Sequence, residues 1–186
     1  MSPAGTTAAI PPDEDETSSR RRILNATAEV LARSGQTKLS LSEVALQAGG
    51  VSRPTLYRWF ASKKTELLDA FGAYEREMFD TGISRATAGL RGTDKLDAAL
   101  QFIVSYQQTY SGGVRLIDIE PEVVIAQLAR ILPLMRTRLQ RLLTGGPNAE
   151  IKAATAIRIA VSHYVVRSDD ADQFLAQLRH AVGIKQ

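Results

Sequence analysis

Residues 52–64 concentrate the side chains of this chain that are best suited to hold a polyanion. No acidic residue interrupts the stretch, and its guanidinium, ammonium, hydroxyl and phenol groups all donate hydrogen bonds. Such donors bind phosphates and the edges of bases. The candidates for these contacts are Ser52, Arg53, Thr55, Tyr57, Arg58, Lys63 and Lys64. Their types and spacing therefore favour nucleic-acid binding.

Two short helices must position these side chains. Ser40 stands three residues before Glu43, a spacing at which the serine caps a helix and the glutamate reaches back to the amide of the cap. Gly49 and Gly50 then permit a sharp turn, because glycine adopts φ > 0 without steric cost. Between cap and turn, four apolar residues recur at helical spacing and share one buried face: Leu41, Val44, Ala45 and Ala48.

The second helix is expected to begin at Ser52. Val51 and Leu56 are spaced as a hydrophobic staple, and Pro54 falls in the first turn, where the N–H that it lacks would be unpaired anyway. The outward face carries Arg53, Thr55, Tyr57 and Arg58. Together the two patterns predict a helix-turn-helix whose second helix enters the major groove of DNA.

A third helix is expected to start directly afterwards, capped by Ser62 and running to about Asp80. Lys63 and Lys64 lie in its first turn, where cations oppose the helix dipole unless an anion arrives. We interpret the two lysines as a phosphate clamp.

The segment from Ser40 to Lys63 resembles the DNA-binding domain of TetR-type (TetR/AcrR) transcriptional repressors. The matching run is V-S-x-x-T-L-Y-R-x-F-x-S-K, preceded by S-x-x-x-V-A, here Val51, Ser52, Thr55, Leu56, Tyr57, Arg58, Phe60, Ser62 and Lys63 after Ser40, Val44 and Ala45. The resemblance implies an all-α protein with a three-helix head that reads DNA, a long fourth helix and a helical body that dimerises and often binds a small effector. Two departures, Gly49 before Gly50 and Pro54 at a position that often contacts bases, weaken the transfer of any known base preference.

The distribution of charge agrees with this division. Residues 1–19 hold four acids and no base, residues 20–64 hold nine bases and two acids, and residues 65–186 hold fourteen of each. We predict a disordered tail (1–18), a helix-turn-helix DNA-binding domain (19–64) whose first helix ends near Gly35, and a helical ligand-binding and dimerisation domain (65–186). The expected DNA contacts are Arg21, Arg22, Ser40, Ser42, Ser52, Arg53, Pro54, Thr55, Tyr57, Arg58, Lys63 and Lys64.

Other classes of protein are disfavoured. The chain has no cysteine, which excludes disulfides and thiolate metal sites, and no apolar run near the ~20 residues that span a bilayer. Two histidines without a catalytic motif make an enzyme a poor interpretation. We expect a soluble, cytoplasmic protein that needs no cofactor or metal and has no membrane partner.

Periodicity organises the body. A loose connection is expected over 82–92, then a helix capped by Thr93 and stopped by Gly112 and Gly113. Residues 114–120 are interpreted as a loop or irregular turn. Pro121 should open the next helix, Pro133 should end or kink it, and a further helix should reach Leu143. Two helices should follow, one capped by Asn148 and one starting near Ser168.

The last two helices are expected to form a dimer interface, because small apolar residues allow close approach. The residues assigned to it are Ala153, Ala156, Ile157, Ala160, Phe174 and Leu178. A dimer would also read two half-sites of a pseudo-palindromic operator. The other interpretation is that this helix is core to a monomer.

A small apolar or amphipathic effector is expected to bind the body and to release the repressor from DNA. Its candidate contacts are Phe102, Tyr106, Tyr110, Leu132, Met135, His163 and Tyr164. Aromatic residues at helical spacing are commonly plain core, and His163 is more simply a core histidine. The alternative function is therefore a ligand-independent dimeric repressor or architectural DNA-binding protein.

Overall fold

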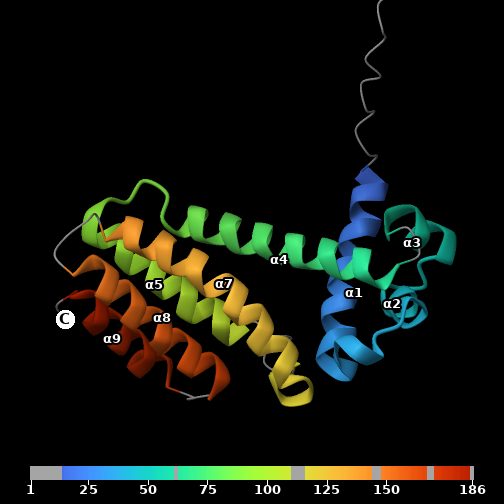
Figure 1. Ribbon diagram of the computed structural model, residues 1–186. Helices are drawn as coiled ribbons and strands as arrows, with labels where there is room; N and C mark the ends of the chain where they lie inside the picture. The colour runs from blue at the N-terminus through green and yellow to red at the C-terminus, as the bar shows by residue number, and fades with distance from the viewer. Residues whose placement is uncertain (1–13, 61–62, 110–115, 144–147, 167–169, 185–186) are drawn as a thin grey trace, which may run out of the picture.

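The computed structural model describes residues 14–60, 63–109, 116–143, 148–166 and 170–184, and within them every regular element is a helix (Figure 1). The helices at the N-terminal end of the chain form a group that a long helix joins to a bundle made by the later helices. The elements are α1 (Glu14–Lys38), α2 (Leu41–Gln47), α3 (Arg53–Phe60), α4 (Lys64–Ala86), α5 (Gly92–Thr109), α7 (Pro121–Leu142), α8 (Ala149–Val165) and α9 (Ala171–Val182). The expected all-α fold, with a helix-turn-helix head and a helical body, is confirmed.

The head is α1 to α3 with the start of α4, and it has its own apolar core. Its fully buried side chains come from all four helices: Ile23, Leu24, Val30, Val44, Leu56, Phe60 and Leu67. Burying each of these contributes about 1.5–3 kcal/mol relative to leaving it in water. This core fixes the angle between α2 and α3.

The body is the bundle of α5, α7, α8 and α9. Contacts run from α8 to both α7 and α9, and from α5 to α9. Ala153 and Ala156 on α8 are fully buried, so their small side chains let neighbouring helices approach α8 closely. The helix α8 is therefore covered by α7 on one side and by α9 on another.

The first helix starts earlier than predicted. It begins at Glu14 instead of Ser19, and residues 14–18, which were assigned to a disordered tail, are helical. The rest of the expected tail, residues 1–13, lies outside the described residues. Gly35 breaks the helical conformation with φ 78° and ψ 173°, as the predicted end required.

Two predicted breaks do not occur. The helix α4 continues to Ala86, because Gly82 is held in the helix against the ring of Phe102, and the turn follows it. The helix α7 continues through Pro133 to Leu142. Because Pro133 has no N–H, the carbonyl of Ala129, four residues before it, loses its helical hydrogen bond. Both residues are exposed, so water can hydrate that carbonyl.

Several helix starts differ by a few residues. Residues 116–119 form a helical turn rather than a loop, while residues 114–115 are not described. The cap of α4 is Lys63, since α4 begins after it, and Ser62 lies outside the described residues. Asp170 caps α9 through the amide of Gln173 at 2.8 Å, so that helix begins later than Ser168, which is also not described. Asn148 precedes α8 as predicted but makes no side-chain cap bond.

The starts of α5 and α7 differ in how well they match the predictions. Pro121 opens α7 as predicted, whereas Thr93 lies inside α5, which begins at Gly92. Gly112 and Gly113 lie outside the described residues. Among the helices of the described part of the chain, none is both long and apolar enough to cross a membrane.

Candidate nucleic-acid interface

Local hydrogen bonds build the helix-turn-helix. The Ser40 hydroxyl accepts from the amide of Glu43 at 3.2 Å, and the Ser52 hydroxyl accepts from the amide of Thr55 at 3.2 Å. Gly49 and Gly50 both take positive φ, 84° and 75°, which a side chain would resist. The predicted caps and turn are confirmed. One detail is wrong, because Glu43 bonds Arg33 at 2.6 Å and does not return to its own cap.

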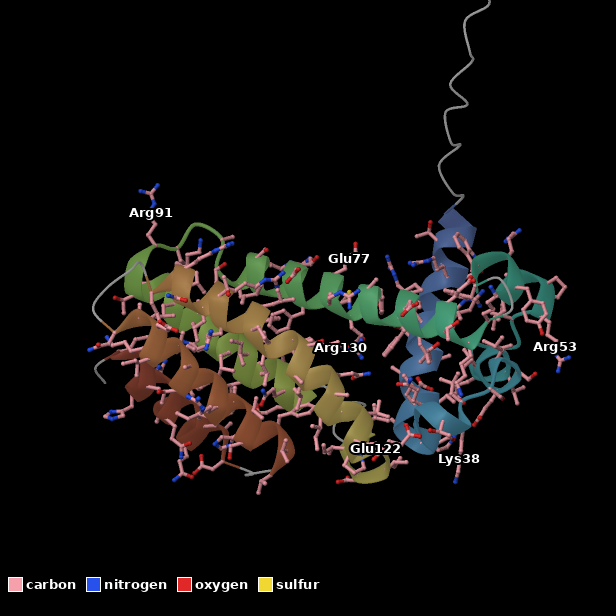
Figure 2. All side chains as sticks on the ribbon, viewed as in Figure 1. Lys38, Arg53, Glu77, Arg91, Glu122 and Arg130 are labelled. Carbon is pink, nitrogen blue, oxygen red and sulfur yellow. The ribbon has the colours of Figure 1, made fainter. Side chains whose placement is uncertain are left out.

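The helix α3 presents two unlike faces. Leu56 and Phe60 are fully buried in the head core, whereas Arg53, Pro54, Tyr57 and Arg58 are exposed. Figure 2 shows Arg53 at the outer end of the head, pointing away from the body. The apolar side chains therefore hold α3 in place while its donors face outward.

Contacts between elements orient some of these donors. The Arg53 guanidinium donates to the Ser42 hydroxyl on α2 at 2.8 Å, which joins the two helices across their outer surface. The Thr55 hydroxyl lies 2.8 Å from that of Ser52. Arg22 on α1 donates to Ser19 at 3.2 Å and lies beside the turn, with its Nη1 3.9 Å from where a Cβ on Gly49 would stand.

The two lysines at the start of α4 have different surroundings. Lys63 has a side chain that is 70% exposed, with Glu66 at 3.7 Å. Lys64 is half-buried, and its Nζ donates to the carbonyl of Thr37 at 2.8 Å. The structure therefore does not place them as a matched pair, because Lys64 is already bound within the protein.

The predicted dimer residues require a correction. Ala153, Ala156, Phe174 and Leu178 are at most 4% exposed within a single chain, where they pack α8 against its neighbours. They cannot meet a second copy. Ile157 and Ala160 are half-buried against the same core. The outer face of the two helices is a groove of about 1090 Å³ lined by other residues, among them Thr155, Ile159, Gln177, His180 and Ile184.

Of the predicted effector residues, the structure brings Phe102 and Tyr106 together and directs His163 to other partners. Phe102 and Tyr106 lie together, with ring centroids 5.7 Å apart. His163 is directed elsewhere, since its ring stacks on Phe174 at 4.0 Å and Nε2 lies 3.2 Å from Oε1 of Gln177 on α9. Leu132, Met135 and Tyr164 are half-buried, and Tyr110 lies outside the described residues.

The sequence analysis missed Phe79, which completes an aromatic cluster between α4 and α5. Its ring meets those of Phe102 and Tyr106 edge to face at 5.4 Å and 5.1 Å. Phe102 fills the notch at Gly82, where a Cβ would stand 2.5 Å from the ring. The Tyr106 hydroxyl donates to Glu75 at 3.4 Å, and burial with that carboxylate raises the pKa of Tyr106 well above its usual range. The sequence signal that could have indicated this cluster is Gly82, three positions after Phe79, because a glycine leaves room for the ring of Phe102.

A hollow of about 340 Å³ opens where α1, α4 and Tyr106 meet, beside this cluster. Tyr74 lines this hollow and donates to Asn25 on α1 at 3.1 Å.

In the described part of the chain, no group of three or more potential metal ligands gathers.

Comparison with known proteins identifies the head. Residues 23–71 match the family model described as bacterial regulatory proteins, tetR family. No curated protein sequence matches the chain.

Solved structures share the fold of most of the chain. A TetR-like transcriptional regulator from Rhodococcus sp. RHA1 superposes with a TM-score of 0.69 and 17% identity, covering 89% of this chain and 93% of that one. A TetR-family transcriptional regulator from Streptomyces coelicolor gives 0.67 and 15%, covering 90% and 95%. One from Haemophilus influenzae gives 0.64 and 14%, covering 92% and 98%. At these identities the likeness establishes the fold.

Proposed function

The chain belongs, through its head, to the tetR family of bacterial regulatory proteins, and from this premise we propose that it is a homodimeric, sequence-specific repressor. The observation that carries the proposal is the division of α3 into a buried face and an exposed face with Arg53, Tyr57 and Arg58. A helix anchored in this way presents donors to base edges in the major groove. Two copies would read two half-sites of a pseudo-palindromic operator.

Base reading and phosphate binding are assigned to different residues. We assign base contacts to Arg53, Pro54 and Thr55, at the start of α3, where helix-turn-helix proteins reach base edges. The phosphate contacts are assigned to Arg21, Arg22, Ser40, Ser42, Ser52, Tyr57, Arg58 and Lys63. Lys64 is assigned to this set as well, because the bond to Thr37 uses one of the three N–H donors of its ammonium.

The dimer is assigned to the outer groove of α8 and α9. Its lining combines apolar Ile159, Ala176, Ala181 and Ile184 with polar Thr155, Gln177 and His180. Apolar side chains together with polar ones are the usual composition of a stable interface. Pairing this groove with its own copy would give a two-fold four-helix contact.

For release from DNA, we propose a small apolar or amphipathic effector that binds beside Tyr106. The hollow next to this residue is lined by the aromatic ring of Tyr74, by Met78 and by Glu75, which supplies a polar group. A ligand there would lie between α1 and α4 and would change how the head sits on the long helix.

A ligand-independent repressor is the second candidate, and one observation favours it. The rings of Phe79, Phe102 and Tyr106 already pack against each other, and Phe102 fills the notch at Gly82. A thermal-shift screen of amphipathic compounds, followed by titration with and without operator, separates the two candidates. An effector that releases DNA binds the free protein more tightly by the factor by which it weakens operator binding. Equal affinity in both titrations supports the ligand-independent repressor.

The DNA-binding assignment is tested on an operator selected from random DNA. Replacing Arg53 by Ala should cost about 1–3 kcal/mol on that operator and should relax the preference at one base position of each half-site. The matched control is Arg91→Ala, which removes the same charge in the turn at the far end of the molecule (Figure 2). If both variants bind as the wild type does, α3 is not the reading helix.

A further inference from the structure

A buried carboxylate joins the body to the head. Glu120 precedes α7 and is 7% exposed. Its two oxygens accept from the backbone amides of Gln36 at 2.6 Å and Thr37 at 2.8 Å, both in α1. Bonds of this kind to a charged acceptor are roughly twice as strong as those between neutral groups.

The backbone at Gly35 is shaped to receive this carboxylate. Its φ of 78° and ψ of 173° interrupt the helical conformation of α1 directly before the two amides that donate to Glu120. A Cβ on Gly35 would stand 2.8 Å from Cδ of Glu120 and 3.1 Å from Cγ2 of Ile119. The fit therefore depends on a glycine at this position.

Glu120 makes this contact instead of a local one. It occupies the N-cap position of α7, where an acidic side chain commonly accepts an amide of its own helix, yet its side chain makes no cap bond. Burial alone would raise the pKa of Glu120, but the hydrogen bonds from Thr37 and Gln36 and the charge of Lys64 lower it. Lys64 donates to the carbonyl of Thr37 at 2.8 Å, so the start of α4 joins the same cluster. The carboxylate is thus held ionised between α1 and α4.

A second attachment matters because α4 is a long lever. Its 23 residues span about 34 Å, so a tilt of about 10° at the body would displace the head by about 6 Å. The helix α7, which follows Glu120, packs on α5 and α8, and its Arg138 binds Asp80 of α4 at 3.2 Å. Because of the contact at Gly35, the segment that leads into α7 is bonded to α1 while α7 itself is bonded to α4. These connections resist such a tilt.

We propose that Glu120 is a positioning residue for DNA binding, which fixes the head on the body by holding the amides of Gln36 and Thr37. It touches no DNA itself. In a dimer it sets the separation of the two α3 helices and thus the half-site spacing that the protein accepts. This inference rests on the proposed function as a dimeric repressor.

The test measures the full-length protein on its selected operator and on operators whose half-sites are moved by one base pair either way. The wild type should prefer its own spacing by about tenfold or more. Glu120→Gln should reduce that preference to about threefold or less, because the amide cannot accept from both N–H groups. The control Glu122→Gln, which removes an exposed carboxylate two residues away, should keep the preference (Figure 2).

Hydrogen exchange supplies a readout that needs no DNA. In Glu120→Gln the amides of Gln36 and Thr37 should exchange at least tenfold faster, while those of Val44 and Leu56 in the head core keep their protection. If Glu120→Gln fails to fold, Glu120→Asp should show the same changes, since its shorter carboxylate cannot reach both amides.

The outcomes separate this proposal from the proposed function. If the wild type selects no operator, the repressor function fails, and the positioning role fails with it. If the wild type binds but Glu120→Gln keeps its spacing preference, only the positioning role is overturned, whether or not the two amides exchange faster.

Discussion

Replacing Gly35 by Ala should destabilise the protein more than a comparable glycine replacement elsewhere. At φ 78° and ψ 173° only glycine is comfortable, and a side chain there costs about 1–3 kcal/mol. The new Cβ would also stand 2.8 Å from Glu120 Cδ, and such overpacking costs a further 1–3 kcal/mol or so. Gly89→Ala is the matched control, since Gly89 has φ 74° and nothing within 4 Å of its would-be Cβ. That replacement should cost about 1–2 kcal/mol.

Urea denaturation measures the difference. Trp59 is the single tryptophan and packs against the head core, so its fluorescence reports unfolding of the head, while circular dichroism reports the whole chain. With a slope of about 1–3 kcal/mol per molar urea, an excess of about 2 kcal/mol lowers the midpoint of Gly35→Ala by about 1 M relative to Gly89→Ala. Equal midpoints for the two variants would refute the close fit of Glu120 against Gly35.

Three further predictions concern α4 and the body. Ile159→Asp should abolish the dimer by placing a charge in the groove of α8 and α9, whereas Ile125→Asp, at a 60% exposed position on α7, should leave it intact, as sedimentation would show. Gly82→Ala should lower the free energy of unfolding by about 1–3 kcal/mol, because the new Cβ meets Phe102 at 2.5 Å. Gly72→Ala in the same helix is the control and should be neutral or stabilising. Similar melting temperatures for the two variants would argue against the aromatic packing. Arg179 donates a hydrogen bond to Asp97 at 2.6 Å, and this bond lowers the pKa of Asp97 below its usual value of 3.8. The stabilisation of the folded state by this pair is therefore fully present above pH 3.8 and is lost as the pH falls through the lowered pKa. The free energy of unfolding should therefore fall more steeply below pH 4 in the wild type than in Asp97→Asn, and parallel pH profiles would show that the pair contributes nothing.

The helix-turn-helix was predictable because it is built by local rules. Ser40 and Ser52 cap helices through amides three residues away, and Gly49 and Gly50 supply the backbone conformation of the turn. Each of these interactions joins neighbours in the sequence. The buried face of α3 follows equally from the spacing of Leu56 and Phe60.

Features that depend on distant partners were not predictable. Whether Pro133 ends a helix depends on what surrounds it, and α7 continues because that turn is exposed. The small residues of α8 have the same pattern whether they meet another copy or their own chain, and the structure places Ala153 in its own core. The hydrogen bond that the amide of Gln36 donates to Glu120 joins residues 84 positions apart, and no pattern in the sequence indicates it.

The central claim, sequence-specific binding of DNA by a pair of heads, is tested most directly by titrating the protein into a selected operator and into random DNA at the same salt concentration, with the mass of each complex measured by sedimentation. We expect two copies on each operator and an affinity at least about 1000-fold above that for random DNA. Equal affinity for both DNAs, or one copy on an operator without two-fold symmetry, would contradict the assignment.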